Sequence, residues 1–186
     1  LNNFFALSLA EIIKSDDILW IHDYQLMLLP ELIRERFGES AVGYFHHIPF
    51  PSFEIFRLLP GAWRDKLMNG LLGSDLAGFH TVDYTHHFLK CASRISKLEN
   101  NLGKITHDGR VTKADTFPIG IDFGKFNDSS QLEEVRAEID RLRSSFAGKK
   151  IILSIDRLDY TKGIVNRLDG YRAFLEKHPE LREKVI

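Results

Sequence analysis

The sequence has one cysteine, no long apolar run and no excess of either charge. The single cysteine, Cys91, excludes an internal disulfide and favours a reducing compartment, so we expect a cytoplasmic protein. The apolar stretches are interrupted by residues such as His22, Asp23 and Glu31 well before the roughly 20 residues of a membrane span, so no membrane partner is predicted. The formal net charge of -1 gives no general attraction to nucleic acid. Any partner must therefore be inferred from local groups of residues.

Several common site signatures are also missing. The sequence has neither a Walker loop nor a GxGxxG fingerprint, so ATP hydrolysis and nicotinamide binding lose their usual support. The pairs His46-His47 and His86-His87 are poorly spaced for one metal ion, because neighbouring side chains point to opposite faces of a strand and do not face each other on a helix. We therefore predict no metal site and no cofactor.

The sequence does contain short apolar runs that alternate with longer runs at helical spacing. This alternation is typical of a mostly parallel sheet covered by helices, and it predicts an α/β fold. Strands are predicted at 18–22, 42–47, 76–79 and 150–155 with a stub at 185–186, and helices at 1–14, 30–37, 62–72 and 83–98. Pro30 fits the first turn of its helix and Gly38 its end, and Thr81 or Asp83 would cap the last of these helices.

The pattern changes after the last of these helices. Alternation within 104–117 around an Asp-Gly pair predicts a hairpin at the sheet edge. A shift in composition over 118–131 indicates a linker before a charged helix that ends near Gly148. We expect one domain over 1–148, with its linker from about 118, and the start of a second over 149–186. One strand, one helix and a stub cannot close a core, so we expect a piece of a longer protein, cut at both ends and poorly ordered or aggregation-prone from 149 onward.

Polar residues follow two of the predicted strands. Asp23 comes directly after 18–22, at the strand end where open α/β sheets bind ligands, and its carboxylate could accept hydrogen bonds from sugar hydroxyls. A helix cap is the alternative role for this carboxylate. His47 ends the strand 42–47 before a proline-stiffened loop, and its alternative role is an imidazole hydrogen-bonded inside the fold.

Two cations flank the turn that follows the strand 150–155. Arg157 and Lys162 precede a predicted helix, whose N-terminus favours anions, and together they would suit a diphosphate. The alternative is that both cations form surface ion pairs with Asp156 and Asp159, which would contribute about 0 to 1 kcal/mol each.

Five blocks of sequence, taken together, resemble the trehalose-6-phosphate synthase family. In chain order they are His22-Asp23-Tyr24, His47-Ile48-Pro49-Phe50-Pro51, Asp75-Leu76-Ala77-Gly78-Phe79-His80-Thr81, Pro118-Ile119-Gly120-Ile121-Asp122 and Asp156-Arg157-Leu158-Asp159-Tyr160-Thr161-Lys162-Gly163. The resemblance implies a GT-B fold with two Rossmann-like domains across a cleft. This chain would hold the latter part of the first, acceptor-side domain and the start of the second, nucleotide-sugar domain.

The resemblance also implies a function and residue roles. The family moves glucose from UDP-glucose to glucose 6-phosphate with retention, needs no metal for this and forms α,α-trehalose 6-phosphate. On this resemblance Asp23 contacts the acceptor, His47 lies beside the transferred glucose as the catalytic histidine, and Arg157 and Lys162 hold the UDP diphosphate. The sequence offers no carboxylate pair for a double displacement, in keeping with attack by the acceptor on the face of the departing group.

One departure and two rival readings remain. His46 stands where the family usually has an apolar residue, and it would either alter the donor pocket or face solvent. A related transferase would use another phosphorylated acceptor, such as glycerol 3-phosphate. A regulatory homologue would bind sugar phosphates without turnover. The small-molecule substrates are the partners we expect, and a homo-oligomer is left open.

Overall fold

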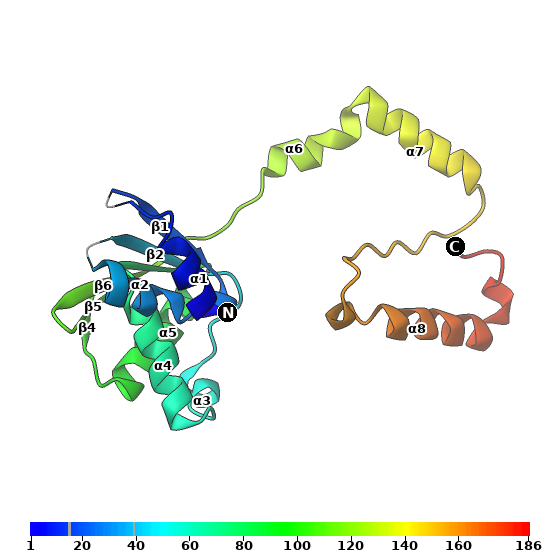
Figure 1. Cartoon of the computed structure of the whole chain (residues 1–186). Coiled ribbons are helices and arrows are strands. Elements are labelled where there is room, and N and C mark those ends of the chain that lie inside the picture. Colours follow the sequence, from blue (N-terminus) through cyan, green and yellow to red (C-terminus); the bar gives the residue numbers. More distant parts are fainter. Residues whose placement is uncertain (15, 39) are drawn as a thin grey trace. The chain divides into compact units, whose positions relative to one another are not determined.

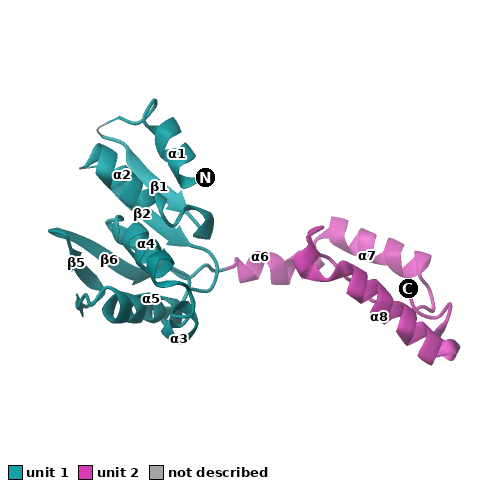
Figure 2. Ribbon diagram, turned by 60° about the horizontal axis from the view of Figure 1, so that its bottom comes forward, with its two compact units in different colours: residues 1–120 teal, residues 121–186 magenta. Residues whose placement is uncertain are grey.

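The computed structural model describes residues 1–14, 16–38 and 40–186, which form two compact units (Figure 1). Unit 1 comprises residues 1–120 and unit 2 residues 121–186 (Figure 2). Each unit is described by itself. Among the described residues, no helix combines the length and apolar character that crossing a membrane would require.

Unit 1 is built on a mixed sheet whose described strands lie in the order β1-β2-β3-β6-β5-β4. The first four of these pair in parallel, and β5 and β4 extend the edge beyond β6 in antiparallel pairing. The bounds are Ile18–His22 for β1, Ala41–His46 for β2, Leu76–Phe79 for β3, Asn100–Asn101 for β4, Lys104–His107 for β5 and Arg110–Thr116 for β6. The parallel α/β sheet and the edge hairpin predicted from the sequence are confirmed.

Helices cover one face of this sheet. The parallel strands β1, β2, β3 and β6 follow one another across the sheet in chain order. Right-handed crossovers between such strands place all the connecting helices on the same face. These helices are α2 (Leu29–Phe37), α4 (Gly61–Leu72) and α5 (Val82–Ile95), with α1 (Asn2–Leu9) packed on α2 and α3 (Phe53–Phe56) on α5. Pro30 lies in the first turn of α2, Gly38 ends it, and the Thr81 hydroxyl accepts the Tyr84 N–H at 3.3 Å as the cap of α5.

Buried and less buried residues alternate along the strands, so the sheet has one face toward the core and one open face. Val42, Tyr44 and His46 of β2 are buried, whereas Gly43 and Phe45 between them are not. The core side packs aromatic rings together, including Phe50, Phe56, Phe79 and Phe88. No described helix of unit 1 covers the other side, where Ile18 is 79% and Trp20 is 69% exposed.

One arginine ties the beginnings of β2 and β3 together. Arg34 of α2, 9% exposed, donates to the carbonyl oxygens of Gly73 at 2.7 Å and Gly38 at 3.0 Å, and it also contacts Ser40 O and the Asp75 carboxylate. Asp75 in turn accepts the Val42 N–H at 2.8 Å. Because the side chain bridges both strand starts, it helps to fix where the carboxyl ends of β2 and β3 lie.

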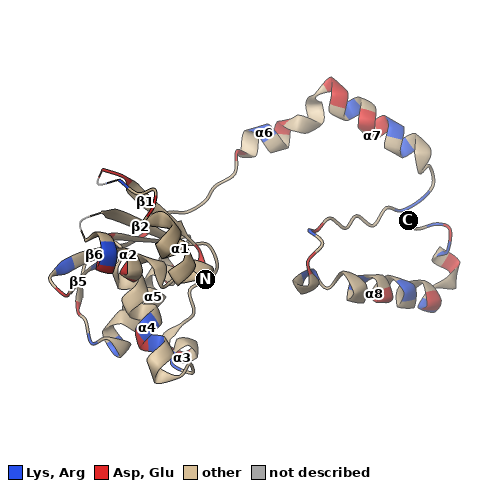
Figure 3. Ribbon diagram, viewed as in Figure 1, with Lys and Arg blue, Asp and Glu red and all other residues tan. Residues whose placement is uncertain are grey.

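Unit 2 has helices but no extended strand among its described residues. Its elements are α6 (Phe123–Asp128), η2 (Ser129–Gln131), α7 (Glu133–Ser145), η3 (Tyr160–Lys162), α8 (Ile164–Lys177) and η4 (Pro179–Leu181). The charged helix before Gly148 is present as α7, which carries acids and bases along its length (Figure 3). The expected linker 118–131 contains the short helix α6.

The strand predicted at 150–155 is wrong. In its place the structure has a single parallel bridge between Lys150 and Val185, with the Ile152 N–H donating to Ile186 O at 2.8 Å. The predicted stub at 185–186 takes part only in this bridge. The reason is burial: a parallel strand is stabilised by neighbours and by apolar cover on both faces, whereas Ile155 is 80% exposed.

Candidate functional site

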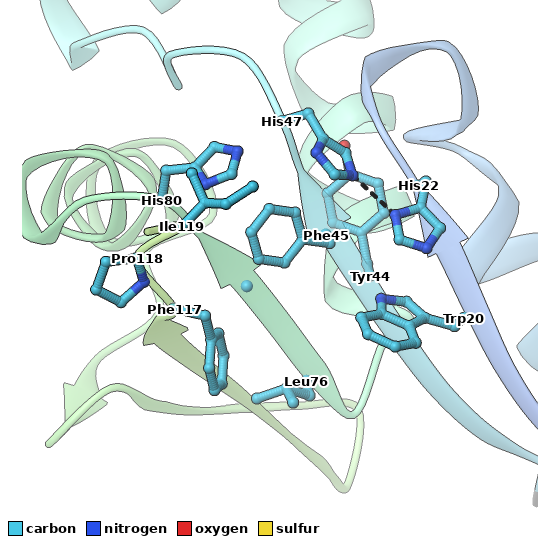
Figure 4. Close-up of a pocket in the computed structure, with 11 residues that line it drawn as sticks. Trp20, His22, Tyr44, Phe45, His47, Leu76, His80, Phe117, Pro118 and Ile119 are labelled. Carbon is cyan, nitrogen blue, oxygen red and sulfur yellow. Dashed lines mark hydrogen bonds between the residues drawn. The ribbon is translucent and has the colours of Figure 1, made fainter. Parts of the chain in front are cut away.

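A cavity of about 540 Å³ lies along the open face of unit 1 and reaches the carboxyl ends of β1, β2 and β3 (Figure 4). Most of its wall is apolar, and three histidines line its polar end. The lining residues are Trp20, Tyr44, Phe45, Leu76, Gly78, Phe117, Pro118, Ile119, His22, His47 and His80. Concave, mostly apolar sites with a few convergent polar groups are the usual form of small-molecule sites.

The three histidines meet because each lies at or just beyond the carboxyl end of one of three neighbouring parallel strands. His22 ends β1, His47 directly follows β2, and His80 directly follows β3. The register pairs His22 with Phe45, and side chains two residues apart share a face, so His47 projects from the same face as His22. Ring centroids are 5.1 Å apart for His22 and His47 and 5.6 Å apart for His47 and His80.

A direct hydrogen bond joins the first two rings. His22 Nδ1 and His47 Nε2 are 2.8 Å apart, and the Trp20 ring stacks on His22 with centroids 5.1 Å apart. His47 is exposed at the cavity, so its ring is not enclosed in the core as the alternative role required. The Nδ1 atom of His80 is buried and has no partner among the described residues. A buried polar atom of this kind usually has a hydrogen-bond partner, so His80 Nδ1 is an exception beside the cavity.

Asp23 turns the chain away from the sheet in a strained conformation. Its φ of +70° and ψ of 171° lie in a region that is essentially restricted to glycine. Its N–H donates to Phe45 O at 2.8 Å, and its Oδ1 accepts the His47 N–H at 3.2 Å. The helix-cap alternative is wrong, because the side chain makes no cap hydrogen bond to η1 (Tyr24–Leu26). The structure thus places Asp23 against His47, and strain held in this way is characteristic of functional sites.

Both expectations for His46 are wrong. Its side chain points to the core face, where it is 2% exposed, so it neither lines the cavity nor faces solvent. The Tyr44 hydroxyl lies 2.8 Å from Nδ1, and Nε2 has no partner among the described residues. Burial lowers the pKa of His46 to about 4 from its ordinary value of 6.5, because the charged ring would be poorly solvated there.

In unit 2, the turn from 156 to 163 carries the two predicted cations. Arg157 and Lys162 are exposed, and neither has an ion-pair partner among the residues that the structure describes. The ion-pair alternative is therefore wrong for these two side chains. Asp159 instead caps η3 by accepting the Thr161 N–H at 2.9 Å, a hydrogen bond that lowers the pKa of its carboxyl. Gly163, with φ +59°, ends η3 and leads into α8, whose first N–H groups favour anions.

The guanidinium of Arg167, in α8, contacts residues on both sides of this turn. Its Nη2 donates to Asp156 Oδ2 at 2.6 Å and to Lys162 O at 3.3 Å, and its Nη1 contacts the Ser154 hydroxyl. One guanidinium therefore contacts both ends of the turn. Because Asp156 forms its ion pair with Arg167, it does not pair with Arg157 or Lys162. The turn therefore carries two cations that make no direct ion pair among the described residues, close to a helix N-terminus.

Sequence reasoning identified Asp23 and His47, which the structure brings together, and Arg157 and Lys162, which share one turn. It assigned no role to His22, His80 or Arg167. The signal for the two histidines was available, because each stands at the end of a predicted strand, as His47 does. The signal for Arg167 was not, because an arginine on an amphipathic helix does not reveal its partners.

Comparison with known proteins gives a consistent result. The family model described as glycosyltransferase family 20 matches residues 1–186. An α,α-trehalose-phosphate synthase (UDP-forming) of Aspergillus fumigatus is 44% identical over 189 residues, which cover 100% of this chain and 36% of the relative. The chain therefore spans about a third of the length of such curated relatives.

Solved structures agree with the fold. The trehalose-6-phosphate phosphatase N-terminal domain of Candida albicans has a TM-score of 0.75 and 37% identity, covering 100% of this chain and 40% of its own. A UDP-forming α,α-trehalose-phosphate synthase of Burkholderia xenovorans, solved in complex with glucose-6-phosphate, has a TM-score of 0.71 and 27% identity, covering 99% of this chain and 42% of its own. The α/β fold of GT-B type predicted from the sequence is confirmed by these neighbours.

Proposed function

The chain belongs to glycosyltransferase family 20, and from this premise we propose that the whole protein moves glucose from UDP-glucose to glucose 6-phosphate. The product is α,α-trehalose 6-phosphate, and the configuration of the transferred glucose is retained. The observation that carries the proposal is the strained Asp23, whose carboxylate lies against His47 at the carboxyl ends of β1 and β2. Open α/β sheets bind their ligands at this edge.

Asp23 binds the acceptor sugar. Its Oδ1 is occupied by the His47 N–H, and its Oδ2 has no partner among the described residues. A carboxylate only accepts hydrogen bonds, so Oδ2 suits a sugar hydroxyl. The glucose-6-phosphate complex of the Burkholderia xenovorans neighbour supports an acceptor of this kind.

His47 lies beside the transferred glucose and fixes its orientation. Its backbone is held by Asp23 and its ring by His22, at 3.2 Å and 2.8 Å respectively. Both restraints come from β1 and the residue that follows it. A side chain held on two sides loses little entropy when it orients a substrate, which is the condition for efficient positioning.

Arg157 and Lys162 bind the diphosphate of the donor. As the bond between the anomeric carbon and the diphosphate oxygen breaks, its electron pair leaves with UDP and negative charge builds on that oxygen. Two cations near a helix N-terminus stabilise this charge more than they stabilise the ground state, so they lower the barrier. The acceptor hydroxyl attacks from the same face and passes its proton to the departing diphosphate. This route needs neither a metal nor another cofactor.

Two other functions remain in the proposal as alternatives. A transferase acting on glycerol 3-phosphate would use the same donor cations with another acceptor. A regulatory homologue would bind sugar phosphates without turnover, and the Candida albicans neighbour favours this alternative, because it is described as the N-terminal domain of a phosphatase.

A cytoplasmic location is part of the main proposal, and Cys91, a buried free thiol, is compatible with it. The oligomeric state stays open.

UDP release by the whole protein tests the proposal. We expect turnover with UDP-glucose and glucose 6-phosphate, no turnover with glycerol 3-phosphate, and a fall in kcat of roughly a hundredfold or more in Arg157→Ala. Arg172→Ala is the matched control, because Arg172 lies in the same unit and, among the described residues, forms an ion pair with Asp169 alone on the surface of α8. Turnover with glycerol 3-phosphate alone would establish the other transferase. Binding without turnover would establish the regulatory homologue.

A further inference from the structure

The pairing of His22 with His47 restricts the hydrogen-bonding character of both rings. A neutral imidazole has one N–H and one bare nitrogen. The 2.8 Å contact between His22 Nδ1 and His47 Nε2 requires one of these atoms to donate and the other to accept. If His22 donates, its Nε2 is bare and His47 Nδ1 carries the proton. If His47 donates, the two outward nitrogens exchange these roles.

In both cases the outward nitrogens are one donor and one acceptor. His22 Nε2 and His47 Nδ1 have no other partner among the described residues, and both rings line the cavity. The neighbouring titratable groups do not compete for them: Asp23 binds the backbone N–H of His47, and His80 meets the His47 ring edge to face. The pair therefore offers a complementary donor and acceptor to the cavity whichever tautomer it adopts.

We propose that His22 is a positioning residue that fixes the rotamer and couples the tautomer of His47, so that the pair recognises a hydroxyl group of the transferred sugar. A hydroxyl both donates and accepts, which matches the two outward nitrogens. The ligand part of this inference rests on the proposed function. The positioning part rests on the hydrogen bond and on the stacking of Trp20 against His22, which holds the first ring in place.

Two variants of His22 distinguish the effect of losing its hydrogen bond from the effect of losing its ring. His22→Phe keeps a ring to stack on Trp20 but removes Nδ1, and His22→Asn loses the ring but keeps an amide near the Nδ1 position. His86→Phe is the control, because His86 is an exposed histidine on α5 outside the cavity. The side-chain ¹⁵N signals of His47 in the 186-residue chain report its tautomer, and kcat and KM of the whole protein report the consequence.

We expect the His47 signals to differ between the wild type and His22→Phe, because the variant lacks the Nδ1 atom whose protonation is tied to that of His47 Nε2. In His22→Phe, kcat should fall roughly tenfold with KM nearly unchanged, since one neutral hydrogen bond is lost from positioning. His22→Asn should recover most of this activity, and His86→Phe should behave as the wild type.

Three results would overturn the inference: unchanged His47 signals in His22→Phe, full kcat in that variant, or equal damage in His22→Asn and His22→Phe. A wild type without turnover would refute the proposed function instead. The ¹⁵N signals would then decide alone whether the tautomer of His47 is coupled to His22, so the two failures are distinguishable.

Discussion

The strand β2 of unit 1 and the segment 150–155 of unit 2 are both short apolar runs that end in polar residues. In unit 1 the run pairs with β1 and β3 and buries Val42 and Tyr44, each 1% exposed. In unit 2 the run makes one parallel bridge, and Ile152 and Ile155 remain exposed. An apolar run therefore becomes a strand only where neighbours and helices are present to cover it.

The two units also present their candidate site residues differently. Asp23 and His47 are fixed by a strained backbone and by hydrogen bonds between strands, so their geometry depends on the whole sheet. The turn that carries Arg157 and Lys162 is shaped locally, by the Asp159 cap and by Arg167. Changes to the core should therefore disturb the first pair much more than the second.

The largest effect is expected from Arg34→Ala. Removal of this guanidinium leaves the Gly73 and Ser40 carbonyls without their side-chain donor, which should cost unit 1 about 3 to 5 kcal/mol. The half-exposed Asp75 carboxylate keeps the Val42 N–H. Both tryptophans of the chain lie in unit 1, so tryptophan fluorescence during urea unfolding measures this unit. Arg36→Ala, an exposed change in the same helix, should have little effect. Equal midpoints for the two variants would show that the bridge between β2 and β3 does not stabilise unit 1.

Local signals made much of unit 1 predictable. The strand bounds 18–22 and 76–79 agree with β1 and β3, because turn residues mark both ends of each run. Pro30 and Gly38 marked the bounds of α2. Such signals depend on a few neighbouring residues, so they can be read from the chain alone.

The rest depends on contacts between distant residues. Alternation showed that His46 and His47 point to opposite faces but not which of them enters the core. The contact of His22 with His47 required the register of β1 against β2. The strain at Asp23 has no local signature, because a non-glycine residue with positive φ is maintained only by its surroundings.

His46 gives the next largest effect and makes the stability of unit 1 depend on pH. Its pKa is about 4 in the folded state because of burial, and 6.5 is the ordinary value. Below pH 6.5 the unfolded chain binds the proton first, so stability falls between pH 6.5 and about 4. Each pH unit of this interval is worth about 1.36 kcal/mol, which gives a loss of about 3 kcal/mol.

His46→Leu should remove this part of the pH dependence, as measured by urea unfolding at several pH values with tryptophan fluorescence. His86→Leu is the control, because His86 is exposed and its loss should leave the profile of the wild type. An unaltered acid slope in His46→Leu would mean that another group of unit 1 takes up the proton on unfolding.

The smallest effect is expected from an isoleucine-to-valine substitution made once in each unit, which compares the two units directly. Ile105 of β5 is 0% exposed and Ile155 is 80% exposed. Ile105→Val removes one buried methylene and should cost about 1 kcal/mol, whereas Ile155→Val should change the free energy of unfolding by less than about 0.5 kcal/mol. Urea unfolding followed by far-ultraviolet circular dichroism detects both units, and amide exchange locates the change along the chain. A cost for Ile155→Val equal to that for Ile105→Val would mean that 150–155 is buried in solution, and the contrast between β2 and this segment would then no longer hold.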